Sequence, residues 1–110
     1  MSHFEPKRSQ KTIITIKNLK TTHQKISMVT CYDASFARII TTTDIDIVLV
    51  GDSLGNVVLG FDNTLKVTLD HMVLHSASVV RGLQSGLGQK PTPLLCVDLP
   101  FLTYTSVEDY

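Results

Sequence analysis

Two carboxylates in this sequence have a placement suited to binding a divalent cation. Asp52 directly follows the apolar run 48–51, and Asp98 directly follows the apolar run 94–97. In parallel α/β folds, ligands bind at the carboxyl ends of strands, where loops and helix N-termini converge. Neighbouring strands lie about 4.8 Å apart, so two such aspartates could share one ion. Mg²⁺ suits the pair because it prefers oxygen ligands and takes one or two protein carboxylates. The alternative for each aspartate alone is a helix cap or a turn residue.

The connection that follows Asp52 is unusually long. Residues 51–67 contain Gly55, Gly60 and the polar run 62–64, and they show no clear helical or strand pattern. Loops of this length without secondary structure are uncommon unless they are functional or mobile. We therefore expect a segment that could close over a small ligand, with an ordinary surface loop as the alternative.

Ser53 offers a second kind of chemistry. The run Gly51-Asp-Ser-Leu54 is similar to the nucleophile block of the GDSL esterases, in which the serine attacks an acyl group. Those enzymes take their base from an Asp-x-x-His pair, and no aspartate in this sequence is followed by histidine at that spacing. A serine without a placed base is a weak nucleophile, so a GDSL-type serine esterase is kept only as an alternative.

Other polar residues could serve as ligands or only as structural groups. His71 and His75 lie four positions apart, a spacing that can bind zinc, although no third ligand is evident from the sequence. Tyr32 and Asp33 lie at the end of a further predicted strand and so point toward the same edge as the aspartates. Tyr32 could line a pocket or simply pack, and Asp33 could cap a helix.

Alternating strand and helix patterns must position these residues. We expect strands at 25–32, 45–50 and 94–97, and helices at 12–20, 34–40 and 69–83, the last with Thr68 as its N-cap. Strands separated by helices indicate an α/β fold with a parallel sheet and right-handed crossovers. Residues 1–11 are expected to form a flexible tail.

Composition narrows the classes of function. The chain has 110 residues, 43% of them hydrophobic, and ten basic residues balance ten acidic ones. Charge alone therefore attracts neither nucleic acid nor an anionic membrane. The N-terminus lacks the apolar core of a secretion signal, no apolar run approaches the ~20 residues that span a bilayer, and the two cysteines lack CxxC spacing. We expect a protein of the reducing cytoplasm.

The length of the chain conflicts with its last residues. Residues 105–108, Thr-Ser-Val-Glu, have the spacing of a capping box, yet the chain stops at Tyr110, within the first turn of the helix they would begin. Isolated helices much shorter than about 12 residues are marginal. We therefore expect a polypeptide that is cut short.

Four blocks of the sequence resemble a known family. Thr30-Cys-Tyr-Asp33, Val48-Leu-Val-Gly-Asp-Ser-Leu-Gly55, Gly60-Phe-Asp-Asn-Thr-Leu65 and Val97-Asp-Leu-Pro-Phe101 resemble, in order and spacing, the signature blocks of ketopantoate hydroxymethyltransferases. The resemblance implies a TIM-type (β/α)8 barrel, of which residues 12–110 would supply the N-terminal three βα units, the third incomplete. It also implies large homo-oligomers and Mg²⁺-dependent transfer of a one-carbon unit from methylenetetrahydrofolate to 3-methyl-2-oxobutanoate, which gives 2-dehydropantoate in pantothenate biosynthesis.

Site residues follow from the same resemblance. Asp52 and Asp98 match the metal-binding aspartates, and Asp52, Ser53 and Asp98 match positions that contact the keto acid. Lys66 stands where the family usually has proline. The family's third metal-associated carboxylate, its substrate-binding lysine and its general-base glutamate would lie beyond Tyr110, so we expect residues 1–110 alone to be inactive. The remaining alternative is a truncated, non-catalytic remnant that self-associates through its exposed sheet edges.

Overall fold

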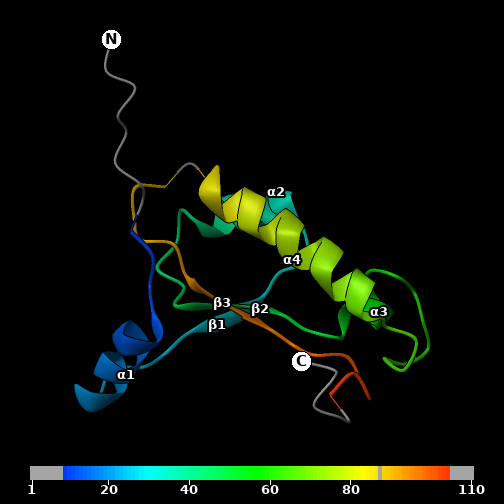
Figure 1. The fold of residues 1–110 in the computed structure, drawn as a ribbon. Coiled ribbons are helices and arrows are strands. Elements are labelled where there is room, and N and C mark those ends of the chain that lie inside the picture. The colour runs from blue at the N-terminus through cyan, green and yellow to red at the C-terminus, as the bar shows by residue number, and fades with distance from the viewer. Residues whose placement is uncertain (1–8, 87, 105–110) are drawn as a thin grey trace.

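The protein folds as a parallel sheet with helices between its strands. The computed structural model describes residues 9–86 and 88–104. The sheet has the order β1-β2-β3, with β1 at Met28–Thr30, β2 at Ile47–Val50 and β3 at Leu94–Val97. The helices are α1 (Ile13–Thr21), α2 (Ala34–Ile40), α3 (Leu54–Val57) and α4 (Leu69–Gln84) (Figure 1). The expected α/β class with a parallel sheet is confirmed.

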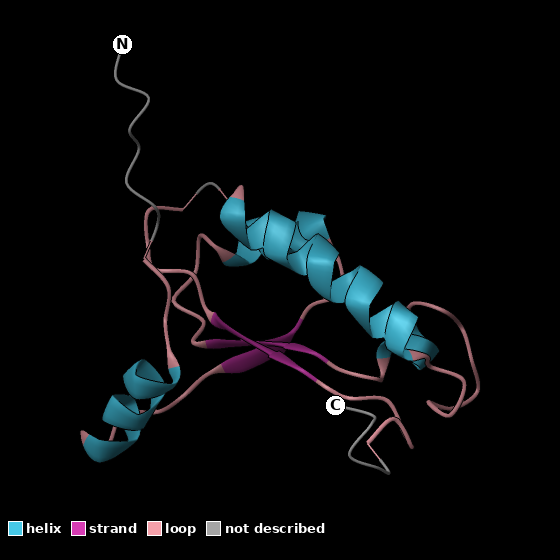
Figure 2. Ribbon diagram, in the orientation of Figure 1, coloured by secondary structure: helices cyan, strands magenta, loops and turns pink. Residues whose placement is uncertain are grey.

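Helices α2 and α4 cover one face of the sheet, whereas α1 lies away from them, near the amino-terminal ends of the strands (Figure 2). Val48 and Val50 of β2 are fully buried, on the face that α4 covers. Because side chains alternate along a strand, Ile47 and Leu49 lie on the opposite face. The core comprises one continuous set of buried residues beneath the helices: Cys31, Ala37, Val48, Val50, Leu54, Val67, Met72, Val79 and Leu83.

Side-chain caps fix where the helices begin. The Asp33 carboxylate accepts a hydrogen bond from the Phe36 amide at 2.8 Å, so Asp33 caps α2. The Thr68 hydroxyl accepts from the His71 amide, and His71 Nδ1 accepts in return from the Thr68 amide at 3.0 Å. Both predicted helix starts are therefore confirmed, with a histidine in the place that glutamate or glutamine usually takes in a capping box.

Two strands are shorter than predicted. The strand expected at 25–32 forms only at Met28–Thr30, and the one expected at 45–50 begins at Ile47. Ahead of the sheet ladder, Ser27 and Asp46 bind one another partly through side chains: the Asp46 amide donates to Ser27 Oγ, and Asp46 Oδ2 accepts from the Ser27 amide at 2.9 Å. Side-chain partners thus replace part of the ladder at this end.

The sequence predicted no secondary structure in the connection at 51–67, but the structure places the single-turn helix α3 within it. Leu54, its first residue, is fully buried in the core. Gly55 packs so closely that an added Cβ would lie 2.5 Å from Val67 Cγ2. This helix depends on contacts with distant residues, which a four-residue pattern cannot reveal.

Residues 9–11 are held against the start of β3. Gln10 pairs with Thr92 in an isolated parallel bridge, the Lys11 amide donates to the Thr92 carbonyl at 2.8 Å, and the Thr92 amide donates to the Ser9 carbonyl at 2.9 Å. The sequence predicted a flexible tail over residues 1–11, and residues 9–11 of that range form backbone hydrogen bonds with Thr92. Residues 1–8 and the predicted capping box at 105–108 lie outside the described residues.

Both cysteines are free thiols. Cys31 is buried and Cys96 is exposed. Burial raises the pKa of the Cys31 thiol above its usual value, so this side chain stays protonated and packs as an apolar group. Of the helices in residues 9–86 and 88–104, none has the length and apolar character needed to cross a membrane.

A part-buried ion pair closes the amino-terminal end of the sheet. Lys11 Nζ lies 2.9 Å from Asp46 Oδ1, with the two side chains only 16% and 13% exposed. The Ser27 backbone amide, and then the Lys11 ammonium, hold the pKa of the Asp46 carboxyl below its usual value of 3.8. Because the folded-state pKa is lowered, the carboxylate stabilises the fold at neutral pH, and this contribution is lost as pH falls through the acid range.

Asp46→Asn is therefore expected to lower the free energy of unfolding at pH 7 by about 2 kcal/mol, since it removes a charged hydrogen-bond acceptor. Below the carboxyl's usual pKa of 3.8, Asp46 of the unfolded chain takes up a proton before Asp46 of the folded protein does, so the difference between the two proteins should shrink. Urea unfolding at pH 7 and pH 3 measures this change. Asp44→Asn is the matched control, because Asp44 is 82% exposed in its ion pair with Lys90. A gap that is equal at both pH values would contradict the prediction.

Candidate functional site

The two aspartates meet at the carboxyl-terminal edge of the sheet. Strands β2 and β3 are direct neighbours, and the Asp98 amide donates to the Val50 carbonyl at 3.1 Å, which continues their pairing. Asp98 Oδ2 then accepts a hydrogen bond from the Asp52 amide at 3.0 Å. The condition that the sequence left open, adjacency of the two strands, is met. One carboxylate is thereby fixed against the backbone of the residue that carries the other.

Gly51 makes room for this contact. It is buried at the end of β2, and a Cβ added to it would lie 3.3 Å from Asp98 Oδ2 and 3.6 Å from the Leu49 side chain. The 3.3 Å separation from Asp98 Oδ2 is tighter than ordinary van der Waals contact. Glycine at this position thus lets the Asp98 carboxylate reach the Asp52 amide.

Gly51→Ala is expected to displace the Asp98 carboxylate by a few tenths of an ångström. With Mg²⁺ as the expected ligand of Asp52 and Asp98, its affinity should fall about tenfold, as changes to groups that orient metal ligands commonly cause. Isothermal titration of Mg²⁺ measures the change in Kd. An unchanged Kd would show that the Gly51 position does not set the carboxylate.

Ser53 directly follows Asp52 and contacts a residue just beyond the end of β1. Its hydroxyl is 2.6 Å from the Tyr32 hydroxyl, and Tyr32 directly follows the first strand. Asp33, which the sequence also directed to this edge, uses its carboxylate to cap α2. Each strand of the sheet therefore contributes to this edge, with Tyr32, Asp52, Ser53 and Asp98 as its polar residues. We call these four residues the rim cluster.

The histidine pair does not form a zinc site. His71 Nδ1 accepts from the Thr68 amide, and His75 Nδ1 lies 2.7 Å from the Tyr32 carbonyl, so each ring has a protein partner in a different place. Within residues 9–86 and 88–104, no three histidine, cysteine, aspartate or glutamate side chains gather as a metal cluster. The interpretation of His71 and His75 as zinc ligands is therefore set aside.

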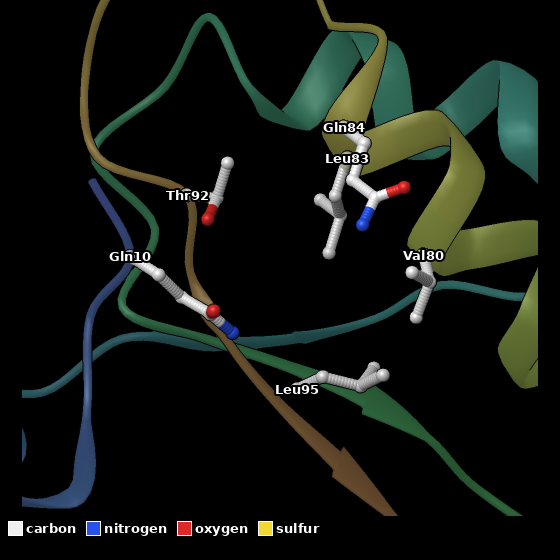
Figure 3. Close-up of a pocket in the computed structure, with 6 residues that line it drawn as sticks. All are labelled: Gln10, Val80, Leu83, Gln84, Thr92 and Leu95. Atoms are coloured by element: carbon white, nitrogen blue, oxygen red, sulfur yellow. The ribbon is translucent and has the colours of Figure 1, made fainter. Parts of the chain in front are cut away.

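A hollow of about 120 Å³ lies elsewhere, between the last turns of α4 and the start of β3 (Figure 3). Its lining is partly apolar and partly polar: Gln10, Val80, Leu83, Gln84, Thr92 and Leu95. It shares no residue with the rim cluster and sits toward the amino-terminal end of the sheet. The rim cluster therefore lies at the opposite end of the sheet from this hollow.

The rim cluster fits a hard divalent cation. It presents two carboxylates on adjacent strand ends, and Asp98 is already held by a backbone amide. Mg²⁺ commonly binds one or two protein carboxylates and completes its octahedron with water and substrate oxygens. Two carboxylates without a third protein ligand are sufficient for that mode of binding.

Comparison with known proteins decides the family. Residues 10–110 match the family described as ketopantoate hydroxymethyltransferase. The chain belongs to this family. Its similarity to individual ketopantoate hydroxymethyltransferases runs through most of the chain.

Three relatives, each named 3-methyl-2-oxobutanoate hydroxymethyltransferase, show the extent of the match. The protein of Bdellovibrio bacteriovorus is 50% identical over 94 residues, covering 86% of this chain and 33% of its own. That of Syntrophotalea carbinolica is 46% identical and covers 88% and 34%. That of an Anaeromyxobacter species is 44% identical and covers 99% and 35%. The chain thus spans about a third of the length of these curated relatives.

Family membership and geometry together weigh against the esterase alternative. The side chain in contact with the Ser53 hydroxyl is the Tyr32 phenol and not an imidazole. The nearby His75 directs Nδ1 to the Tyr32 carbonyl. A phenol bonded to serine does not supply the general base that a GDSL-type nucleophile requires.

Lys66, at the position where the family usually has proline, interacts within the 51–67 connection. Its ammonium lies 5.9 Å from the centroid of the Phe61 ring, and the Phe61 and His71 rings are 6.2 Å apart. Cation–π contacts at exposed sites contribute about 0.5–1 kcal/mol. The lysine therefore contacts a residue of the connection itself.

Proposed function

We propose that the protein transfers a hydroxymethyl group from methylenetetrahydrofolate to 3-methyl-2-oxobutanoate, forming 2-dehydropantoate, with Mg²⁺ held by Asp52 and Asp98. The observation that carries this proposal is the hydrogen bond from the Asp52 amide to Asp98 Oδ2 at the edge of two adjacent parallel strands. It joins the backbone of one aspartate to the carboxylate of the other, 46 positions away in the sequence. The relatives' shared name supplies the keto acid and the group transferred.

The residues of the rim cluster would have different roles in the reaction. Asp52 and Asp98 would hold the cation, and the Asp52 amide holds the Asp98 carboxylate in place. When bound, Mg²⁺ would supply positive charge that polarises the keto group and stabilises an enolate. Ser53 donates a hydrogen bond to the carboxylate of the keto acid. The general base is expected outside residues 1–110, as the family resemblance implies.

We further propose that the sheet is part of a closed barrel. The strands follow one another in chain order, β1-β2-β3, and α2 and α4 both cover the same face. In doubly wound sheets the strand order reverses, so helices cover both faces; a barrel keeps one direction and places its helices outside. The uncovered face carries apolar residues such as Met28, which is 51% exposed. Those side chains would fill the interior of a barrel.

Activity measurements on the protein produced from the complete coding sequence test the proposed function. We expect 2-dehydropantoate formation that a chelator abolishes and added Mg²⁺ restores. Residues 1–110 alone should give no turnover. Ester hydrolysis that is lost in Ser53→Ala and is indifferent to chelators would favour the esterase instead.

Residues 1–110 on their own are expected to self-associate. The structure leaves many large apolar side chains exposed, among them Val97 at 40% and Phe101 at 55%, and within residues 9–86 and 88–104 no further strand pairs with the outer edge of β1 or β3. Exposed strand edges and apolar patches promote pairing with further chains. Sedimentation velocity should show species larger than 12.2 kDa that grow with concentration. A single, stable monomer at all concentrations would contradict this expectation.

A further inference from the structure

The contact between Tyr32 and Ser53 connects the ends of β1 and β2, and the proposed function gives Tyr32 no role. Their hydroxyl oxygens are 2.6 Å apart, toward the short end of the range for O–H···O hydrogen bonds. Tyr32 follows β1 and Ser53 follows β2, and both side chains are part-buried. The bond therefore ties the serine to the first strand of the sheet.

The chemistry of the two hydroxyls gives this bond a direction. A phenolic O–H is more acidic than an aliphatic one, so the favoured arrangement has Tyr32 donating and Ser53 Oγ accepting. The Ser53 hydroxyl then keeps its own proton for another acceptor. Hydrogen bonds in a chain polarise one another, so a serine that accepts from a phenol becomes a better donor.

Tyr32 is itself held from the helix layer. His75 Nδ1 lies 2.7 Å from the Tyr32 carbonyl oxygen. A carbonyl can only accept, so Nδ1 carries the proton in this contact, whether the ring is neutral or charged. His75 lies near the middle of the 16-residue helix α4. The backbone of Tyr32 is thus tied to a long helix just beyond the end of β1, and rigid elements hold a site more accurately than loops do.

Charge explains why such a donor is needed. Asp52 and Asp98 make this edge of the sheet negative, and an anionic ligand that enters beside them meets like charge. A cation would offset that charge on one side of the ligand. A carboxylate oxygen on the other side still requires a neutral donor, and a polarised hydroxyl supplies one.

From these contacts we infer that Tyr32 is a positioning residue, which orients the Ser53 hydroxyl so that its proton faces the carboxylate of the keto acid. This inference rests on the proposed function and adds a group that acts through Ser53. It assigns Tyr32 no contact with the reacting carbon and none with the cation. Its effect should therefore appear in the binding of the keto acid.

Steady-state kinetics of Tyr32→Phe in the protein from the complete coding sequence tests the inference. This variant removes the hydroxyl and keeps the ring. The KM for 3-methyl-2-oxobutanoate should rise about tenfold, as expected for loss of a hydrogen bond that supports a charged contact. The kcat, the KM for the folate co-substrate and the Kd for Mg²⁺ should each stay within about twofold, whereas a general structural defect would move them together.

A double-mutant cycle provides the second readout. Ser53→Ala should raise the same KM, and adding Tyr32→Phe to Ser53→Ala should raise it no further, because the phenol then has nothing to orient. Ser53→Thr, which keeps the hydroxyl, should restore sensitivity to Tyr32→Phe. Additive effects of the two substitutions, or an unchanged KM in Tyr32→Phe, would overturn the role of Tyr32 while leaving the proposed function intact. Absence of keto acid turnover in the unsubstituted protein would instead overturn the proposed function and this inference with it.

Discussion

Asp98→Asn is expected to weaken Mg²⁺ binding by at least about 100-fold and to remove most hydroxymethyl transfer. The amide oxygen of asparagine can still accept from the Asp52 backbone amide, which Asp98 Oδ2 now does at 3.0 Å, so the local geometry should survive. What is lost is one unit of negative charge. At about 4 Å and an effective dielectric constant of 20, such a charge contributes about 4 kcal/mol, and each 1.4 kcal/mol is tenfold in affinity.

The measurement is isothermal titration of Mg²⁺ into the protein from the complete coding sequence, together with turnover at saturating Mg²⁺. Asp44→Asn makes the same chemical change at an exposed position before β2, at the other end of the sheet, and should leave both quantities unchanged. Circular dichroism of Asp98→Asn should match that of the unsubstituted protein. Equal Mg²⁺ affinity in the two variants would refute the assignment of Asp98 as a cation ligand.

Gly82→Ala is expected to lower the free energy of unfolding by about 2 kcal/mol, although alanine is the better helix former by about 1 kcal/mol. Gly82 is buried where α4 crosses α2, and an added Cβ would lie 2.6 Å from the Cβ of Ala37 and 2.8 Å from the Cα of Ala34. Backbone atoms cannot rotate away as a side chain can, so the two helices must separate. Overpacking of this kind typically costs about 1–3 kcal/mol, and contact with backbone places this case at or above the upper end.

Thermal unfolding followed by circular dichroism measures the effect. Gln84→Ala is the control, because it makes a substitution to alanine on an exposed position of the same helix. It should be neutral or slightly stabilising. A Gly82→Ala protein as stable as the Gln84→Ala protein would mean that the α2–α4 contact is looser than the structure shows.

The sequence revealed those parts of the fold that local patterns determine. The strand at 94–97 was predicted to the residue, and α4 was predicted to within one residue because its apolar spacing extends over four turns and Thr68 marks its start. Helix α3 was missed because its four residues are held by the burial of Leu54 and by the Gly55–Val67 contact. Such contacts depend on the folded chain and leave no periodicity in the sequence.

The candidate site, like the fold, could be predicted from the sequence only in part. The positions of Asp52 and Asp98 at strand ends could be read from the apolar runs before them, and only the strand order was needed to bring them together. The bond between Tyr32 and Ser53 could not be predicted, because it depends on the adjacency of β1 and β2 and on the reach of a phenol across that gap. The role of His75 was also hidden, since its partner is a backbone carbonyl 43 positions away.

The bridge between Gln10 and Thr92 has a consequence for the order in which the chain folds as it is synthesised. Strands β1 and β2 are separated by only one short helix, so they can pair soon after Val50 is made. Residues 9–11 must wait for Thr92. At about 5–20 residues per second, the roughly 80 residues between the two partners take about 4 to 16 s to add. The earliest described part of the nascent chain is thus among the last to form its backbone hydrogen bonds.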